Sequence, residues 1–541
     1  GSEMCIRDSY YFVQDTVHTA TNRHDRLKTD CLNAEVNYED NTVSRYTREN
    51  FSFAGTWKSG VSDITGDNAI FQKIKNSQWE LKNYFNQLYT KEKYTWGIRL
   101  YIRYTHCPAS LTVAHRNLPI LFADNMLIAN CIYHRNELSS PDNISENTYR
   151  TVIGQTHESI LAEYEEMNTG NAYTDNVLYG MRKINGVNYQ LTGGFCGELS
   201  SVKQENAYSA HSYSFYTVPR IEWERNDFLF TAATTVRWSH LPKQSYSRFC
   251  VSPFFCFRYK FTPRWKMSLL GSLDESEGGL KDIYPFRYRE DYRTVVKHTG
   301  KVPVTVRQLY TCYLEYKNTI KEFFWTLSAS YSHNRYNLIT ERNYKDGNFY
   351  LSSVERNHSS HSYTLNTIGS KGIYDWNLKT SLELTLARNE GKQLNEGIVQ
   401  DYRYDYLCIE PKIVWAPSVF FEAEYKATVS CVGGGIGEDT SLDPLWEVAQ
   451  RLTLSLEFHD TEFRLSGEHF YNDLSKNQHL NIWLADVSLI HKVGKWRFAA
   501  SAINLFNKEQ YRYTLYSAVQ SYTSWIKLRP REFMVSVQYQ W

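Results

Sequence analysis

The last nine residues of the chain alternate strictly between the two faces of an extended strand. Because side chains point alternately to opposite sides of a strand, one face consists of Phe533, Val535, Val537, Tyr539 and Trp541. Soluble chains usually end in a polar, frayed segment. A closed barrel in a membrane needs a final strand that presents an apolar face to lipid while it pairs with the first strand. The ending therefore favours a membrane β-barrel, with the last strand of a soluble β-sandwich as the alternative.

Charge and composition narrow the classes of protein that the chain can belong to. The 541 residues include 60 Lys plus Arg and 59 Asp plus Glu, a balance that creates no field for nucleic acid. The 42 tyrosines and 14 tryptophans suit strands that cross two membrane interfaces, and they also suit a carbohydrate-binding β protein. The mean hydropathy is −0.53, and no run of about 18 apolar residues could cross a membrane as a helix. Barrel strands expose only alternate residues to lipid, so their average hydropathy can be this low.

Alternating segments recur through the C-terminal half, and their polar faces carry charges of both signs. Strands buried in a soluble core also alternate, but mixed charges on strand after strand indicate a water-filled lumen. In the segments 374–388 and 452–458, we therefore expect Leu382, Leu384 and Leu454 to face lipid. The residues expected to line the lumen are Lys379, Glu383, Glu422, Glu424, Lys426, Arg464 and Glu468.

The connections between these segments alternate in length. The short ones lie near 262–264, 371–375, 416–418, 459–461 and 493–495, and the long polar ones near 275–303, 335–360, 389–402, 433–446, 474–479 and 506–519. Outer-membrane barrels show this asymmetry. We therefore predict an all-β fold, a large antiparallel transmembrane β-barrel of about 22 strands with short periplasmic turns and long extracellular loops. The last strand is expected to run from about 522 to 541, and Pro253 predicts a bulge or a strand boundary within its segment.

The domain organisation predicted from the sequence is simple. Residues 1–9 lack the basic region and apolar core of a signal peptide. They look like a vector or sequence-assembly remnant, so we treat 1–9 as a non-native leader. Residues 10–541 are assigned to one barrel domain, without a second domain, coiled coil or low-complexity linker.

Three elements near the C-terminus resemble the end of TonB-dependent receptors of the outer membrane. The residues that carry the resemblance are Asn504, Leu505, Phe506, Asn507, Lys508, Tyr511, Arg529 and Arg531. The first six are similar to an Asn-Leu-Phe-(Asp/Asn)-Lys-x-x-Tyr element, and the two arginines to the Arg-x-Arg-x-aromatic opening of the last strand. Terminal Trp541 completes an ending that resembles the signal read by the barrel-assembly machinery. The Tyr-rich strands look like those of barrels from Bacteroidetes.

The resemblance implies a location in the outer membrane of a Gram-negative bacterium and import of a scarce nutrient, such as a siderophore, cobalamin, an oligosaccharide or a peptide. It also implies a plug domain inside the barrel and a TonB energy-coupling complex as partner. The sequence enters barrel strands soon after the leader, so the plug is expected to be missing from this copy. The other partners implied are outer-membrane lipid and the assembly machinery. A passive channel, or a secreted soluble β protein that binds or cleaves polysaccharide, is the alternative.

The sequence shows no catalytic constellation, so we expect a protein without enzyme activity, metal or cofactor. His358 and His361 are spaced as H-x-x-H, and we interpret them as solvated loop residues. The glycine-rich stretch 433–437 resembles a phosphate-binding loop, but no helix pattern follows it, so it is interpreted as a flexible outer loop. Loop aromatics such as Tyr284 and Tyr288 are assigned to an interfacial belt, with stacking on a ligand as the alternative.

Overall fold

The structure is a computed structural model of the chain. It describes residues 2–11, 16–66, 70–91, 94–115, 162–204, 207–290, 294–345, 348–437, 440–475, 478–516 and 520–539. Within these ranges, no helix is both long enough and apolar enough to cross a membrane. Extended strands account for nearly all of the regular structure, as the alternating sequence predicts.

The strands of the N-terminal half are β1 (Ser2–Tyr11), β2 (Thr16–Asn41), β3 (Arg45–Gly66), β4 (Ile70–Lys91), β5 (Tyr94–His115), β6 (Ala162–Ile184), β7 (Val187–Lys203), β8 (Ala207–Arg225), β9 (Phe228–Leu241), β10 (Tyr246–Thr262) and β11 (Trp265–Glu277). The middle contains β12 (Tyr288–Arg289), β13 (Thr294–Lys297), β14 (Val304–Asn318), β15 (Phe323–Lys345), β16 (Asn348–Ile373) and β17 (Leu378–Asn395). The remaining strands are β18 (Ile398–Ser418), β19 (Phe421–Ile436), β20 (Thr440–Phe458), β21 (Thr461–Ser475), β22 (Gln478–Val493), β23 (Trp496–Ile503), β24 (Gln510–Tyr516), β25 (Gln520–Lys527) and β26 (Glu532–Tyr539). Three short 3₁₀ turns are η2 (Pro242–Gln244), η3 (Leu280–Ile283) and η4 (Tyr374–Trp376).

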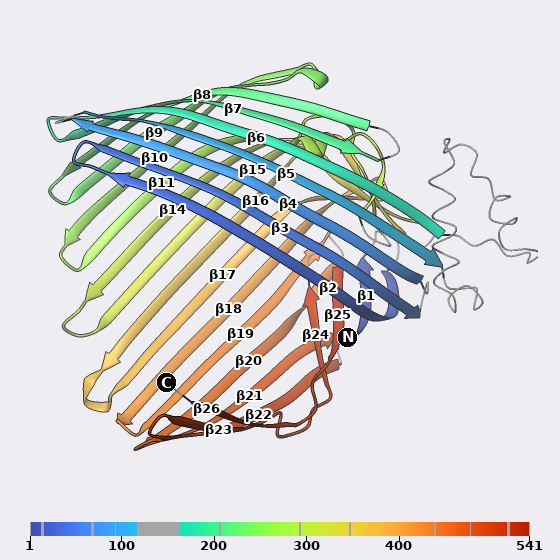
Figure 1. Cartoon of the computed structure of the whole chain (residues 1–541), viewed down its shortest axis with the longest axis vertical. Helices are drawn as coiled ribbons and strands as arrows, with labels where there is room; N and C mark the ends of the chain where they lie inside the picture. Colours follow the sequence, from blue (N-terminus) through green and yellow to red (C-terminus); the bar gives the residue numbers. More distant parts are fainter. Residues whose placement is uncertain are drawn as a thin grey trace, which may run out of the picture.

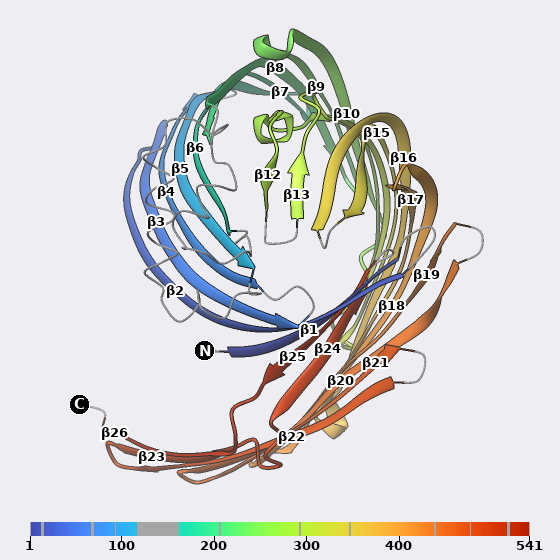
Figure 2. The same ribbon diagram turned by 90° about the vertical axis from the view of Figure 1, so that its right-hand side faces the viewer.

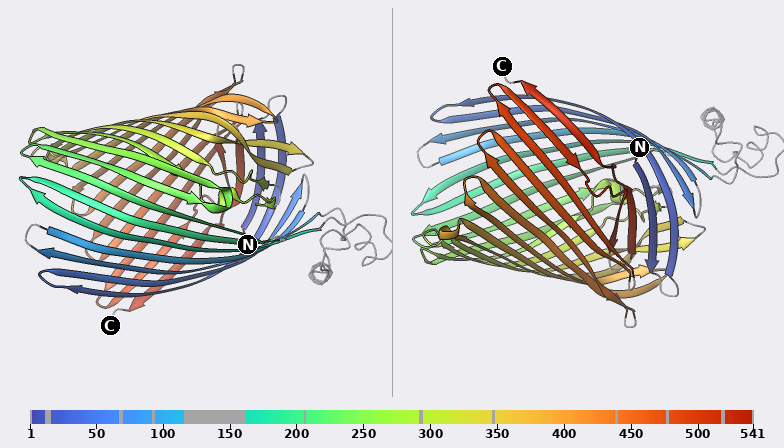
Figure 3. Two further views of the ribbon diagram at one scale, coloured as in Figure 1. Left: turned by 90° about the horizontal axis from the view of Figure 1, so that it is seen from above. Right: turned by 90° about the horizontal axis from the view of Figure 1, so that it is seen from below.

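One 26-stranded sheet curves around a central space and forms a large β-barrel (Figure 1). Strands β12 and β13 lie inside the curve, and β23 and β26 extend away from the ring of strands at the C-terminal end of the sheet (Figure 2). Every neighbouring pair in the wall is antiparallel from β2 through β11 and from β14 through β23. The strands cross the wall at a common tilt (Figure 3), as closure of a sheet into a barrel requires. The predicted fold class is confirmed.

The hairpin formed by β24 and β25 lies between the two ends of the sheet. Strand β25 pairs with β1, and β24 lies against β21 and β22 (Figure 2). Strand β26 returns to the other side and pairs with β23. The predicted single strand from 522 to 541 is therefore wrong, because the structure divides it into β25 and β26. The break contains Pro530, which has no N–H to donate to a ladder.

Residues 2–11 form β1, which pairs with β2 and β25. Most of these residues belong to the predicted leader 1–9. The pairing of backbone groups depends little on side-chain identity, so a segment of unusual composition can still complete a sheet. Pro253 lies within β10 and does not end it. The β10–β11 ladder reaches only Phe254, and beyond it the N–H of Glu275 donates to the hydroxyl of Ser252 over 3.2 Å.

Most of the long polar connections are built as extended hairpins. The β15–β16 ladder continues to Lys345 opposite Asn348, and β17 turns into β18 through Glu396 and Gly397. Both turn residues have positive φ, 48° and 79°, which suits a tight hairpin turn. Strands of up to 26 residues result, although about 9–11 tilted residues suffice to cross a bilayer. The extra length therefore projects beyond the band that a membrane would cover.

Candidate functional site

The residues expected to line the lumen all lie on one face of the sheet. Residues opposite each other in a ladder share a face, and so do residues two apart along a strand. Ladder pairs connect Ser381 to Lys412, Lys412 to Lys426, Lys426 to Arg451 and Arg451 to Glu468. The period of two then adds the remaining candidates, which are Lys379, Glu383, Glu422, Glu424 and Arg464.

This polar face is the inner one. Ladder pairs followed from β8 to β17 place Ala210 on the same face as Glu383. Ala210 packs with Ile283 and Tyr284, which belong to the segment inside the curve of the wall (Figure 2). The seven charged candidates therefore line the interior of the barrel.

Ion pairs cross between neighbouring strands of this inner face. The Nζ of Lys412 lies 3.1 Å from Glu424, and the Nε of Arg451 lies 3.4 Å from Glu468. Arg464 pairs with Glu462 over 2.9 Å within β21. These side chains are partly exposed, so each pair contributes about 1 kcal/mol or less. Lys412 and Arg451 were not predicted, because cross-strand neighbours cannot be known before the register. Glu462 lies two residues before Arg464 on the same strand, so the alternation alone could have found it.

A second polar region of the lumen lies on β5, β6 and β8. Asp175 accepts a hydrogen bond from the hydroxyl of Tyr216 over 2.7 Å and another from Arg99 over 3.4 Å. The guanidinium of Arg103 lies 5.4 Å from the ring centre of Tyr173. Arginine and tyrosine side chains together can bind an anionic or aromatic ligand. The alternation of charged residues and tyrosines along β5 and β6 is the sequence signal that could have found this region.

An inward-folded segment, residues 278–290 and 294–303, lies inside the mouth of the barrel (Figure 2). Ile283 and Tyr284 within it are 0% and 2% exposed, and Tyr284 packs edge-on against Tyr208 with ring centres 5.6 Å apart. The assignment of Tyr284 to an interfacial belt is therefore wrong. Strand β13 pairs with the start of β16 in parallel, and Asn337 donates to the carbonyl of Val302. Backbone pairing and apolar burial thus hold the segment against two sides of the wall.

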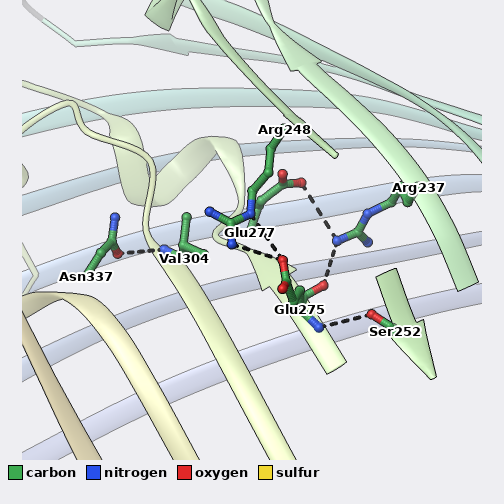
Figure 4. Close-up of polar contacts among 7 residues, drawn as sticks. All are labelled: Arg237, Arg248, Ser252, Glu275, Glu277, Val304 and Asn337. Atoms are coloured by element: carbon green, nitrogen blue, oxygen red, sulfur yellow. Dashed lines mark hydrogen bonds and ion pairs between the residues drawn. The ribbon is translucent and has the colours of Figure 1, made fainter. Parts of the chain in front are cut away.

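Charged residues fasten the wall beneath this segment (Figure 4). Two nitrogens of Arg248 donate to one oxygen of Glu275, over 2.9 and 3.2 Å. Arg237 donates to the backbone carbonyl of Glu275 over 2.7 Å and lies 3.8 Å from the carboxylate of Glu277. The side chain of Asn337 accepts from the N–H of Val304 over 2.7 Å. Two cations and two anions balance, so the cluster ties β9, β10 and β11 together at this end.

The outer face of the wall is apolar and exposed. Leu382 is 51% exposed, and Phe533, Val535 and Val537 are 74%, 81% and 55% exposed. Ladder pairs place these three residues of β26 on the same face as Leu454. Tyr539 belongs to this face as well, whereas Trp541 lies outside the described residues. A large apolar surface turned outward is expensive in water and favourable in lipid.

Two belts of aromatic side chains border this apolar face. Near the tight turns, the pairs Tyr89–Trp96, Trp265–Tyr316, Trp265–Trp325 and Trp496–Tyr539 have ring centres 4.5, 4.8, 6.0 and 4.8 Å apart. Further along the strands lie the pairs Trp79–Tyr104, Phe215–Trp238, Tyr331–Tyr363 and His469–Trp483. From Trp325 to Tyr331 and from Trp96 to Tyr104, the strands advance roughly 20–27 Å. Because barrel strands are tilted by roughly 35–45°, this advance corresponds to roughly 14–22 Å across the wall, against about 25 Å for the apolar band of an outer-membrane barrel.

The residues of the C-terminal motif meet at one hydrogen-bonded junction centred on Asn504. Its side chain, 6% exposed as a residue, donates to the carbonyls of Lys508 and Arg529 and accepts from the N–H of Lys508, all within 2.9 Å. The N–H of Arg531 donates to the side chain of Asn507 over 2.9 Å. The N–H of Leu505 donates to the carbonyl of Ala485. Phe506 is 56% exposed, and the side chain of Tyr511 lies outside the described part of the chain.

The H-x-x-H motif and residues 433–436 of the glycine-rich stretch lie in strands, although both motifs were predicted to lie in loops. His361 belongs to β16, where its ring centre lies 4.5 Å from that of His333. His358 stacks on Tyr336 in the same hairpin. Residues 433–436 pair with 402–405 as part of β19. Across the described residues, no group of three or more His, Cys, Asp or Glu side chains is arranged to hold a metal ion.

Comparisons with known proteins give matches to solved structures. No family model matches the sequence, and no curated protein matches it. The chain is similar to the copper transporter OprC, with 9% identity over 99% of this chain and 81% of that one and a TM-score of 0.40. It is also similar to the siderophore receptor PirA from Pseudomonas aeruginosa, with 10% identity over 93% and 80% of the two chains and a TM-score of 0.33. The ferric yersiniabactin uptake receptor FyuA from Yersinia pestis matches at 8% identity over 99% and 80%, with a TM-score of 0.32.

Proposed function

We propose that this chain is the barrel of an outer-membrane receptor that imports a scarce nutrient, of the TonB-dependent type. The observation that carries the proposal is the pair of aromatic belts around an exposed apolar face, combined with a charged inner face on the same strands. A soluble β protein would bury the apolar face. The motif centred on Asn504 supports the receptor type, because it resembles the corresponding element of that family.

The lumen supports a transport role and leaves the ligand class open. Its inner face carries charges of both signs, including Lys412 paired with Glu424, and the region around Asp175 and Tyr216 offers both donors and acceptors. We propose that these groups contact a plug domain and the polar groups of a passing ligand, with TonB coupling supplying energy. A siderophore, cobalamin, an oligosaccharide or a peptide would fit this chemistry.

A heat-modifiability experiment tests the membrane barrel. The full chain refolded into lipid vesicles is expected to migrate differently in an SDS gel before and after boiling, because a closed barrel resists detergent until heated. Identical migration of the two samples, with the protein remaining in the aqueous fraction, would favour the secreted soluble protein.

The effect of an added plug on conductance and uptake separates the receptor from the passive channel. If the lumen needs a plug, the refolded chain alone should leak solutes, and joining a plug and coupling segment should suppress the leak and restore energy-dependent uptake. Energy-dependent accumulation by the chain alone would contradict this part of the proposal.

The apolar face of β26 is proposed as the signal for assembly. Replacing Tyr539 and Trp541 with serine is expected to reduce outer-membrane accumulation several-fold while synthesis is unchanged, measured by quantitative immunoblotting of membrane fractions. The matched control replaces Ser536 and Gln538, on the opposite face of the same strand, with alanine. Equal loss in both variants would show that the face of the strand does not matter.

A further inference from the structure

An open groove with a volume of about 760 Å³ crosses the outer face of β15 to β19. It lies at the aromatic belt that is farther from the tight turns, which includes Tyr331 and Tyr363. Most of the groove is lined by two adjacent rungs, each of which is a row of residues paired across neighbouring strands. The lower rung is apolar and consists of Leu365, Leu386, Leu407 and Cys431. The upper rung consists of Tyr363, Arg388, Asp405 and Gly433. The boundary between the apolar band and the charged exterior therefore runs through the groove.

Two arginines share one carboxylate at the upper end of the groove. The Nε of Arg388 lies 2.6 Å from Asp405, and the Nε of Arg403 lies 3.1 Å from the other oxygen of Asp405. Both guanidinium groups are about half exposed, at 49% and 52%. Because both contacts use Nε, the outer nitrogens of both arginines remain available to a phosphate, which guanidinium groups bind in a bidentate manner.

Other charged groups lie farther from the apolar band. Glu390 is the ladder partner of Arg403, one rung beyond Arg388. Lys392 pairs with Asp401 over 2.9 Å, two residues farther along β17. Glu390 lies farther from the apolar band than Arg388, so a phosphate at the level of Arg388 would lie on the membrane side of Glu390.

Gly433 keeps the groove open. A Cβ built on Gly433 would have Pro444 as its nearest neighbour, 3.9 Å away, which is ordinary contact. A larger side chain at this position would therefore point into the groove without displacing the strand.

We propose that this groove binds a lipid whose headgroup carries a phosphate. An acyl chain would lie along Leu365, Leu386 and Leu407, and the phosphate would bind Arg388 and Arg403. The inference rests on the proposed membrane location of the barrel and adds a specific lipid site to it. Apolar grooves alone accept any acyl chain, so the arginine pair provides the selectivity for phosphate.

Native mass spectrometry of the full refolded chain tests this inference. Phosphatidylglycerol is titrated against a galactosyl diacylglycerol that has the same acyl chains and no phosphate. We expect one tightly retained phosphatidylglycerol, and about tenfold weaker retention when R388Q and R403Q are combined, because charge-assisted hydrogen bonds are lost. G433L should weaken the retention of both lipids while it keeps every charge. R182Q is the matched control, since Arg182 lies over the ring of Tyr94 on the outer face near the tight turns.

The possible results separate this inference from the proposed function. Equal retention of the two lipids, or retention unchanged by R388Q with R403Q, overturns the phosphate site. A similar loss caused by R182Q shows a general charge effect and also overturns it. Each sample is checked by the gel shift on boiling. A wild-type chain that shows no shift contradicts the membrane barrel itself, whereas a shifted chain without lipid preference contradicts the lipid site alone.

Discussion

Replacing Asn504 with alanine is expected to lower the free energy of unfolding by about 3–5 kcal/mol. The substitution leaves the N–H of Lys508 and the carbonyls of Lys508 and Arg529 without their partner in a buried position. Asn504 also has φ +54°, which asparagine tolerates better than alanine does. Urea unfolding of the chain refolded in lipid vesicles, followed by tryptophan fluorescence, measures the difference.

Asn507 provides the matched comparison for this junction. It has φ +50° and accepts one hydrogen bond, from the N–H of Arg531. N507G keeps the backbone conformation available and removes one partly exposed hydrogen bond, so the loss should be about 1 kcal/mol. If N504A and N507G destabilise the chain equally, the junction does not depend on the buried side chain of Asn504.

Leu382→Arg is expected to cost roughly 2–4 kcal/mol, because the charge would lie on the lipid face near the middle of the apolar band. The same substitution at Ser381 should cost little, because Ser381 shares the inner face with Glu383 and Lys412. The two positions are adjacent in sequence and differ in the face of the strand. Urea titration of both variants in the same lipid gives the comparison, and similar costs would show that the faces are misassigned.

Alternation alone predicted much of the fold. The period of two divided β17 into Leu382 and Leu384 on one face and Lys379 and Glu383 on the other, and the ladders place them so. This works because side-chain direction in a strand is a local property of the backbone. The extent of the hairpins was not predicted, since polar residues outside the membrane band occur equally in loops and in solvated strands.

The inward-folded segment shows where local reasoning fails. Tyr284 is an aromatic residue in a long connection, where a belt residue is expected. In the structure it is only 2% exposed, and its ring packs against Tyr208. The two residues are far apart in sequence and come together only when η3 folds inside the wall. The broken last strand is similar, because β25 and β26 pair with different partners, β1 and β23.

The sequence by itself determined the class of fold, the polar and apolar faces of the strands, and the motif that contains Asn504. Each of these is encoded in neighbouring or alternate residues. Only the tertiary structure decided which charges meet, as in Lys412 with Glu424, and which arginines share Asp405. The physical reason is register: a slip of one residue turns every side chain to the other face, and the register results from the pairing of whole strands.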